Sequence, residues 1–499
     1  MSISVSRALP FALAALAAVS SANAAPTSIL FVGNSYTFGR TDGSLNPDGT
    51  LNLTNQVLTY NAANVRDLSA PRGPDLVVGG TNASTPKFTD LTGTNSYPIG
   101  VNNPSGVQGN SYSPHTQTNT WGGTAGIFKQ FTVQAGLDYD VALSTRNAAS
   151  LRGHLLNTAN SNWDLRSNIS SQQWGSIVLQ DQSDEALAPK TVATDSTGRP
   201  LNVGTSGVLG SNFPSVRAYV DLIEDWVHTG RVTIAQGLAA VTSYIERDMF
   251  RAQYRPPGGT NAQADAACQN AGGGTFCTNS LTRDLGLNVN ANLDTRIYLQ
   301  ETWARPDLIN SPGAKTINPV TAMATYDTNT PAPSYFGSLE EMTEQMRLAM
   351  LSVRDYADDD GSSGIKGIIP TGQAFLRAVQ DGVATRNMYS TDAGTDGLMD
   401  LWFNDGTHPS KWGSYLSALT VFGSVTGLDP QSLGYHEWAA KDLGISGEDA
   451  YTLQQIAAAS LGFQKVPEPG SLALVLAGVG MLGVVARRRK LRAPNQLIG

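Results

Sequence analysis

Short apolar runs that each end in a cluster of polar residues recur along this chain and predict buried strands. A run of four to eight apolar residues closed by turn residues is typical of a strand in a parallel sheet. Helical segments separate these runs, and such alternation predicts βαβ units and an α/β fold with a mostly parallel sheet. The predicted strands are Ile29–Val32, Tyr139–Ser144, Gln173–Leu179, Arg296–Gln300 and Ile365–Pro370.

Apolar residues at helical spacing predict the helices between and after these strands. Ser338-x-x-Glu341 is a capping-box signature and predicts a helix that begins there and runs to about Tyr356. The other predicted helices are Ala125–Ala135, a stretch from Leu151 that contains His154, Val216–Val227, a helix from Ala374, and Tyr415 to about Val425.

The first predicted strand leads directly into Gly33-Asn34-Ser35. Ligands of α/β sheets bind beyond the carboxyl ends of the strands, so the Ser35 hydroxyl is expected to face a crevice. Glycine, asparagine and serine are also the commonest turn residues, so the same tripeptide fits an ordinary strand-to-helix turn.

A serine nucleophile needs a neighbouring base, usually a histidine oriented by a carboxylate. Among the five histidines of the chain, His408 stands in a predicted loop with Asp405 three residues before it. At that spacing the carboxylate can reach imidazole Nδ1 and leave Nε2 to take a proton from Ser35. Asp405-Gly406 is a strong turn dipeptide as well, so a plain turn is the alternative interpretation.

Composition and charge narrow the class of protein. The 499 residues are 40% hydrophobic and 15% charged, which is typical of a globular protein. A net charge of −8 argues against a nucleic-acid partner, which would favour a basic face. Stretches near 41–120 and 240–290 interrupt the strand and helix pattern, and the first of them is rich in Asn, Thr, Ser, Gly and Pro. We interpret both as insertions in one domain at 25–463, and the first as a candidate lid or rim beside the site.

The first 24 residues have the three parts of a secretory signal peptide: Arg7, the apolar stretch Ala8–Val19 and Ala22-Asn23-Ala24. The mature chain is expected to begin at Ala25. Export makes Cys268 and Cys277 candidates for one disulfide, with two free thiols as the alternative. The sequence contains no C-x-x-C or H-E-x-x-H motif, and we predict no metal and no cofactor.

The tail at 464–499 contains Pro467-Glu468-Pro469, an apolar run at 471–486 and the basic cluster Arg487–Lys490. A generic membrane helix with a cytoplasmic basic flank is one interpretation. The three parts in this order resemble a PEP-CTERM sorting signal. The resemblance implies an inner-membrane anchor through 471–486, processing by an exosortase, and delivery to the cell surface or the medium.

Two blocks of the chain resemble those of the SGNH, or GDSL-like, hydrolase superfamily. Phe31–Thr37 is similar to the first block in a G-N-S-[FY]-T form, and Asp405–Pro409 is similar to the last block with its D-x-x-H pattern. The resemblance implies a three-layer α/β/α sandwich like that of flavodoxin, a catalytic Ser35–His408–Asp405 triad, and ester hydrolysis.

The same resemblance implies an oxyanion hole made of three donors. The first is the Ser35 backbone N–H. The second, a backbone N–H after the second strand, falls at Ala148 or Ala149, where the family has glycine. The third, an asparagine amide in the family, is replaced by Gln180 or Gln182. Trp303 and Arg305 follow another strand that should end on the same side, and we expect one of them to line the pocket.

These observations predict an exported serine esterase that cleaves acyl esters, with O-acetyl groups of a polysaccharide as the suggested substrate. An α/β-hydrolase is disfavoured because Thr37 stands where the G-x-S-x-G elbow has its second glycine. The main alternative is a catalytically silent surface or matrix protein that binds a partner on the same scaffold.

Overall fold

A computed structural model describes the central part of the chain and several shorter segments around it. The described residues are 27–39, 47, 56–61, 64–68, 121–146, 149–156, 165–181, 185–187, 190–191, 208–209, 213–235, 255, 259–270, 282–318, 323–358 and 364–463.

A six-stranded sheet forms the centre of the described structure, with the strand order β12-β9-β4-β1-β3-β2. Every neighbouring pair in it is parallel, which confirms the predicted α/β fold. Its strands are β1 (Thr27–Gly33), β2 (Arg66–Asp67), β3 (Tyr139–Thr145), β4 (Ser176–Leu179), β9 (Arg296–Gln300) and β12 (Gly367–Ile369).

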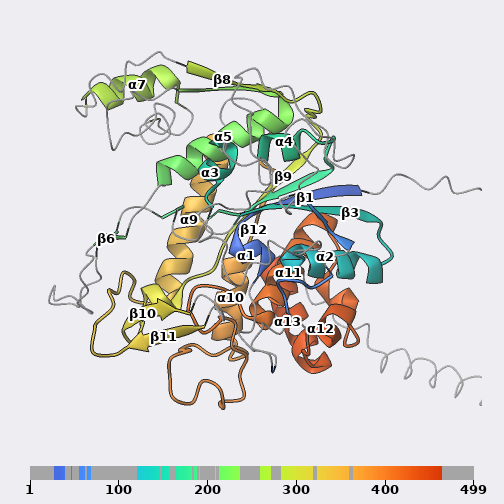
Figure 1. Cartoon of the computed structure of the whole chain (residues 1–499), viewed down its shortest axis with the longest axis vertical. Coiled ribbons are helices and arrows are strands. Elements are labelled where there is room, and N and C mark those ends of the chain that lie inside the picture. Colours follow the sequence, from blue (N-terminus) through green and yellow to red (C-terminus); the bar gives the residue numbers. More distant parts are fainter. Residues whose placement is uncertain are drawn as a thin grey trace, which may run out of the picture.

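Helices cover both faces of this sheet (Figure 1). Side chains alternate between the faces along β1, so Ile29 and Phe31 join one apolar core while Leu30 and Val32 join the other. The first core is completed from α2 (Gly123–Gln134), α10 (Thr371–Gln380), α11 (Lys411–Thr426), α12 (Trp438–Asp442) and α13 (Gly447–Ser460). The second is completed from α3 (Leu151–Leu156), α4 (Leu165–Ile169), α5 (Phe213–His228) and α9 (Leu339–Ala357). The arrangement is the expected three-layer sandwich.

The remaining described elements are short or lie outside the central sheet. Three antiparallel ribbons pair β5 (Lys190–Thr191) with β6 (Val208–Leu209), β7 (Arg231–Ala235) with β8 (Thr282–Leu287), and β10 (Ala314–Ile317) with β11 (Ala324–Asp327). The other helical elements are α1 (Ser35–Phe38), α7 (Asn261–Asn270), and the 3₁₀ turns η3 (Pro306–Leu308) and η4 (Pro430–Leu433).

The described parts of the two predicted insertions contain regular structure. Within 41–120, β2 extends the central sheet beside β3, and Val57 and Leu58 are buried in the first core. Within 240–290, the described residues include α7 and strand β8. The predicted signal peptide, the side chains of Cys268 and Cys277, and the tail from 464 onward lie outside the described residues. None of the described helices combines the length and the apolar character that crossing a membrane requires.

Candidate active site

The Ser35 turn stands at the carboxyl end of the central strand β1. β1 lies between β3 and β4, and the chain crosses from one side of β1 to the other between these two strands. A reversal of strand order of this kind is where α/β sheets open a crevice for ligands. Asn34 Oδ1 accepts a hydrogen bond of 3.1 Å from the Tyr36 backbone N–H, which caps α1 and sets Ser35 as its first residue.

Glycine is required at position 33 because two side chains approach its backbone. A Cβ atom there would lie 2.4 Å from Thr37 Oγ1 and 2.5 Å from Gln180 Oε1. Gln180 Oε1 accepts hydrogen bonds from the Asn34 backbone N–H at 3.0 Å and from Thr37 Oγ1 at 2.8 Å. Gln180 thus holds the turn that presents Ser35.

The structure brings Ser35, His408 and Asp405 together in a continuous chain of hydrogen bonds. Ser35 Oγ lies 2.7 Å from His408 Nε2, and His408 Nδ1 lies 2.6 Å from Asp405 Oδ2. A carboxylate on Nδ1 fixes the proton there, so Nε2 is the nitrogen that accepts from the serine hydroxyl. This geometry is that of a nucleophile, a base and a group that orients the base.

The loop that carries His408 is shaped by Asp405 itself. Asp405 Oδ1 accepts the backbone N–H groups of Thr407 and His408, each at 2.9 Å. The carboxylate therefore folds the loop with one oxygen and orients the imidazole with the other. Asp405 is 1% exposed and His408 8%, so both are shielded from competing water.

Aromatic rings pack against the triad. The Tyr36 ring meets the His408 imidazole edge to face with ring centroids 5.2 Å apart, and the Trp303 ring lies 5.0 Å from the Tyr36 ring. Trp303 is stacked on Phe375 at 4.8 Å and donates its indole N–H to the Thr407 carbonyl at 3.0 Å. These packing contacts and this hydrogen bond hold the imidazole in position.

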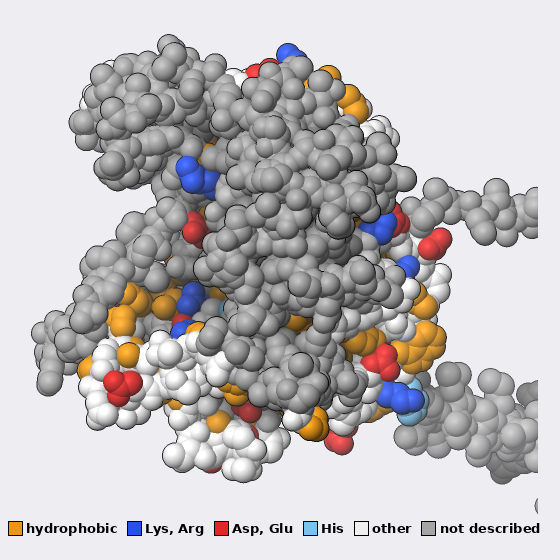
Figure 2. Space-filling view, viewed as in Figure 1, with side chains coloured by type: hydrophobic (Ala, Val, Ile, Leu, Met, Phe, Trp, Pro, Cys, Tyr) orange, Lys and Arg blue, Asp and Glu red, His pale blue; other side chains and the backbone are white. Residues whose placement is uncertain are grey.

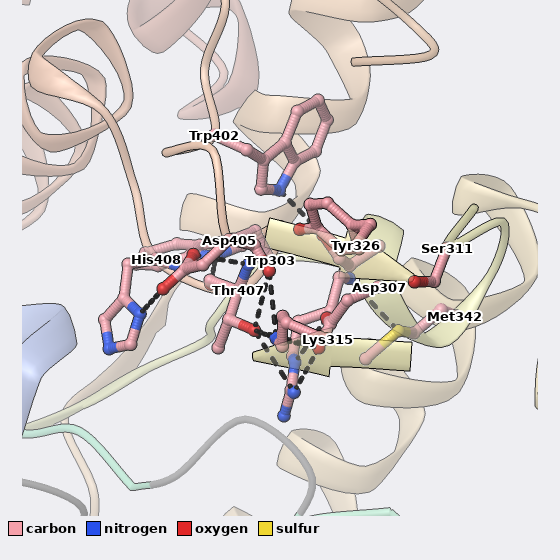
Figure 3. A network of polar contacts seen from close by, with 12 residues as sticks. Trp303, Asp307, Ser311, Lys315, Tyr326, Met342, Trp402, Asp405, Thr407 and His408 are labelled. Carbon is pink, nitrogen blue, oxygen red and sulfur yellow. Dashed lines mark hydrogen bonds and ion pairs between the residues drawn. The ribbon is translucent and has the colours of Figure 1, made fainter. Parts of the chain in front are cut away.

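A buried polar network supports the His408 loop from the β10 side (Figure 3). Lys315 Nζ donates to the Asp405 carbonyl at 2.9 Å, to Thr407 Oγ1 at 2.8 Å and to Asp307 Oδ2 at 2.7 Å. Arg305 pairs with both oxygens of Asp307. Burial alone would raise the pKa of Asp307, but Arg305 and Lys315 outweigh it and hold that pKa below its usual value.

We expect Asp307→Ala to lower the free energy of unfolding by about 3 kcal/mol, because it leaves Arg305 and Lys315 without their shared buried partner. Urea unfolding of the purified variant measures the loss. Glu344→Ala, which removes an exposed ion pair with Arg347, is the matched control and should change stability little. Equal effects of the two substitutions would show that the network does not stabilise the loop.

Two of the residues predicted to line an oxyanion hole, Ala149 and Gln180, make hydrogen bonds inside the protein. The Ala149 N–H donates to the Arg146 carbonyl at 3.3 Å, and the Ala149 carbonyl accepts from Asn34 Nδ2 at 3.1 Å. The Gln180 amide nitrogen donates to the Asp181 carbonyl, while its oxygen holds the turn that contains Ser35. Both residues are therefore committed to the loops around Ser35, because amide and peptide groups so well buried need partners inside the protein. Ala148 and Gln182 lie outside the described residues.

The remaining predicted donor is the backbone N–H of Ser35. As the first residue of α1, it has no partner within the helix, and no hydrogen bond from it occurs among the residues that the structure describes. Nor does the described part of the chain contain a group of three His, Cys, Asp or Glu side chains placed to hold a metal ion.

Trp303 and Arg305 both come close to the site but not in the same way. Trp303 is only 1% exposed and braces Tyr36 and the His408 loop. Arg305 is bound to Asp307, and its Nη2 lies 3.3 Å from Thr407 Oγ1. Both therefore contact residues that position His408, and contact with a substrate stays a prediction for either.

His154 is a buried residue that sequence reasoning left without a role. Its Nε2 lies 2.9 Å from the Gly33 carbonyl, so Nε2 must carry a proton and donate. Burial lowers the pKa of His154 to about 4, and the ring is neutral at physiological pH. It anchors the end of β1 immediately before the turn that contains Ser35.

This lowered pKa predicts a loss of stability in mild acid. The unfolded chain takes up a proton on His154 near pH 6.5 but the folded chain does so only near pH 4, so stability falls as the pH drops between these values. Between pH 7 and pH 5 we expect the free energy of unfolding to fall by about 2 kcal/mol more in the wild type than in His154→Gln. Urea unfolding at both pH values measures this, with the exposed His436→Gln as control. Equal losses in wild type and His154→Gln would contradict the assignment.

A known sequence motif matches the tail of the chain. Residues 465–490 match the model of the PEP-CTERM protein-sorting motif. The tail carries a PEP-CTERM sorting motif. The predicted sorting signal is thereby confirmed, and it implies export, processing by an exosortase and sorting to the cell surface. No curated protein matches the chain.

Two solved structures resemble the chain at low similarity. One is a DUF4886 family protein from Bacteroides uniformis, with a TM-score of 0.33 and 11% identity over 88% of this chain and 95% of that one. The other is a candidate SGNH hydrolase from Slackia heliotrinireducens, with a TM-score of 0.27 and 11% identity over 80% of this chain and 98% of that one. Similarity of this degree carries no information about activity, which has to come from the geometry of the site.

Proposed function

We propose that this protein is an exported serine esterase that uses Ser35, His408 and Asp405 as its catalytic triad. The observation that carries the proposal is the continuous chain of two short hydrogen bonds, 2.7 Å from Ser35 to His408 and 2.6 Å from His408 to Asp405. A buried serine hydroxyl bonded to the free nitrogen of an oriented imidazole is an activated nucleophile. The position of the turn beyond the central strand supports the same function.

In this mechanism Ser35 Oγ attacks the carbonyl carbon of the ester while its proton passes to His408 Nε2. The tetrahedral intermediate collapses as His408 returns that proton to the leaving alcohol, and the acyl group stays on Ser35. Water then attacks the acyl-enzyme with His408 again as base, which releases the acid and restores the serine. Asp405 stabilises the imidazolium that forms in both halves.

The Ser35 backbone N–H is the donor that supports the developing oxyanion in this proposal. It sits at the start of α1 beside the nucleophile, where a backbone donor can reach the oxygen of a bound acyl group. A further donor from the predicted set would have to come from Ala148 or Gln182. Loss of one oxyanion donor lowers an enzyme's rate by about 10²–10³-fold. Without a further donor, the esterase is therefore expected to be slow.

The second candidate is a catalytically silent surface protein that binds a partner on this scaffold. The observation in its favour is that Ala149 and Gln180 use their donors within the protein. A protein with the triad but without an oxyanion hole would keep the fold and lose most of its catalytic rate.

The sorting motif suggests where the esterase would act. We propose one catalytic domain at 25–463 and a tail at 464–499 that anchors it in the inner membrane through 471–486 until an exosortase processes it. A surface-delivered esterase would meet acylated polymers there, and O-acetyl groups of a polysaccharide are the proposed substrate class.

A panel of p-nitrophenyl esters from acetate to octanoate, together with an O-acetylated xylan, tests the activity. The esterase proposal expects turnover of at least the acetyl ester, with acetate released from the polymer. No turnover of any ester by folded protein would favour the silent binding protein.

A further inference from the structure

A surface pocket remote from Ser35 lies between η4 and the start of α13. Its volume is about 610 Å³, within the range of small-molecule binding sites. Figure 2 shows hydrophobic side chains beside acidic, basic and histidine side chains on this part of the surface, over α2 and α12. The residues that line it include Tyr435, His436, Trp438, Lys441 and Glu448.

Two aromatic side chains of this pocket are exposed to solvent. Tyr435 is 54% exposed and Trp438 is 49% exposed. Tyr435 is stacked on Tyr451 at 4.1 Å with an angle of 20° between the rings, so its orientation is fixed before any ligand arrives. Large aromatic surfaces left open in this way mark binding sites, because covering them is favourable.

Hydrogen bonds hold the backbone at Trp438. The Glu437 carboxylate caps α12 by accepting the Ala439 and Ala440 N–H groups at 2.8 Å and 2.6 Å. The Trp438 N–H donates to Gln134 Oε1 at 2.9 Å, and Gln134 Nε2 donates to the Leu433 carbonyl at 2.8 Å. Because this backbone is already ordered, it loses less conformational entropy when a ligand binds.

The polar side chains of the rim are available to a ligand. His436, Lys441 and Glu448 are exposed, and within the described part of the chain their side chains make no hydrogen bond or ion pair. Glu437, in contrast, is buried and occupied by the cap of α12. The rim therefore offers one carboxylate, one ammonium and one imidazole, with no excess of either sign.

We propose that this pocket binds a neutral oligosaccharide. A pyranose ring presents C–H groups on its flat faces, which stack on aromatic rings, and hydroxyl groups around its edge, which bond to carboxylate, ammonium and imidazole groups. The pocket supplies two exposed aromatic side chains, one of them already stacked, and three polar groups of mixed sign. A strongly anionic or cationic ligand would meet a charge of its own sign on this rim.

This site is separate from the proposed active site. The pocket lies at the Gln134 end of α2, while Gly123 at the other end packs against Phe38 of α1. At 1.5 Å per residue, the 12 residues of α2 span about 18 Å. The oligosaccharide site therefore does not depend on the Ser35 chemistry and would tether the protein to a polymer in either case.

Calorimetric titration of the purified exported protein with cellotetraose and with chitotetraose tests the proposal. We expect at least one of them to bind, and Trp438→Ala to raise its Kd about tenfold or more through the lost stacking. Leu398→Ala removes an exposed apolar side chain outside this pocket and should leave the Kd unchanged. Turnover of p-nitrophenyl acetate should be the same in all three proteins.

Two results would overturn the proposal. One is the absence of binding by either tetrasaccharide at millimolar concentration. The other is binding that Trp438→Ala leaves unchanged. In the first case, sedimentation shows what the pocket does instead. Loss of self-association in Trp438→Ala would identify the pocket as an interface between copies of this chain.

Discussion

Ser35→Ala should lower kcat/KM for ester hydrolysis by about 10⁴-fold or more, because it removes the only atom that forms the acyl-enzyme. The Ser35 hydroxyl is 2.7 Å from His408 Nε2, the nitrogen that would take its proton. The backbone of the turn should survive, since Asn34, Gln180 and Gly33 shape it without the Ser35 side chain. Initial rates with p-nitrophenyl acetate measure the loss.

Ser432→Ala is the matched control for this variant. Ser432 is an exposed serine of η4 whose Oγ donates to the Asp429 carbonyl and makes no contact with the triad among the described residues. Its removal should leave kcat/KM unchanged. If Ser35→Ala kept more than a tenth of the wild-type rate while its urea midpoint matched the wild type, Ser35 would not be the nucleophile.

Asp405→Asn should have the second largest effect, a fall in kcat of about 10⁴-fold. An asparagine Oδ1 can still accept the Thr407 and His408 N–H groups, so the loop should keep its fold. Its amide nitrogen would then face His408 Nδ1 as a donor and favour the tautomer with the proton on Nε2. That tautomer cannot accept the Ser35 proton.

Kinetics across the pH range separate this tautomer effect from simple misfolding. The variant should regain part of its rate at high pH, where hydroxide can replace the general base, while its unfolding midpoint stays near that of wild type. Asp381→Asn, an exposed carboxylate paired with Arg377, serves as control. A kcat within tenfold of wild type in Asp405→Asn would contradict the role given to the carboxylate.

The central sheet could be predicted from the sequence because its strands are buried on both faces. Arg296–Gln300 is a strand with the predicted bounds, and Ile29–Val32 lies inside β1. The capping box also forms, with Ser338 Oγ accepting the Glu341 N–H at 3.1 Å. Continuous apolar runs and helix caps are local signals, so they can be recognised in the sequence without knowledge of the tertiary structure.

The edge strand β2 and the β10–β11 ribbon were missed because their sequences lack these signals. Arg66–Asp67 is a two-residue strand of charged side chains, and it is ordered by pairing with β3 rather than by its own pattern. β10 and β11 alternate weakly and are mostly part-exposed. Tertiary contact overrides strand propensity at such edges.

The candidate site shows the same division between local and tertiary information. Asp405 and His408 could be paired from the sequence because three residues in one loop must lie close together. Lys315 and Asp307 could not, since a lysine on a hairpin and an aspartate in a 3₁₀ turn meet the loop only in three dimensions. The contacts of Gln180 could not be predicted for a similar reason, since its side-chain oxygen bonds to the Asn34 N–H, 146 positions earlier in the chain. The oxyanion hole stays a prediction.

Covalent labelling with a fluorophosphonate tests the central claim most directly, because phosphorus reacts only with an activated nucleophile and fluoride leaves as the bond to oxygen forms. If Ser35 is the nucleophile, we expect one adduct per molecule, mapped by mass spectrometry to the peptide that contains Ser35. The adduct should be absent in Ser35→Ala and should form at least tenfold more slowly in Asp405→Asn. A folded protein that takes up no label, or takes it up on another residue at the same rate in Ser35→Ala, would contradict it.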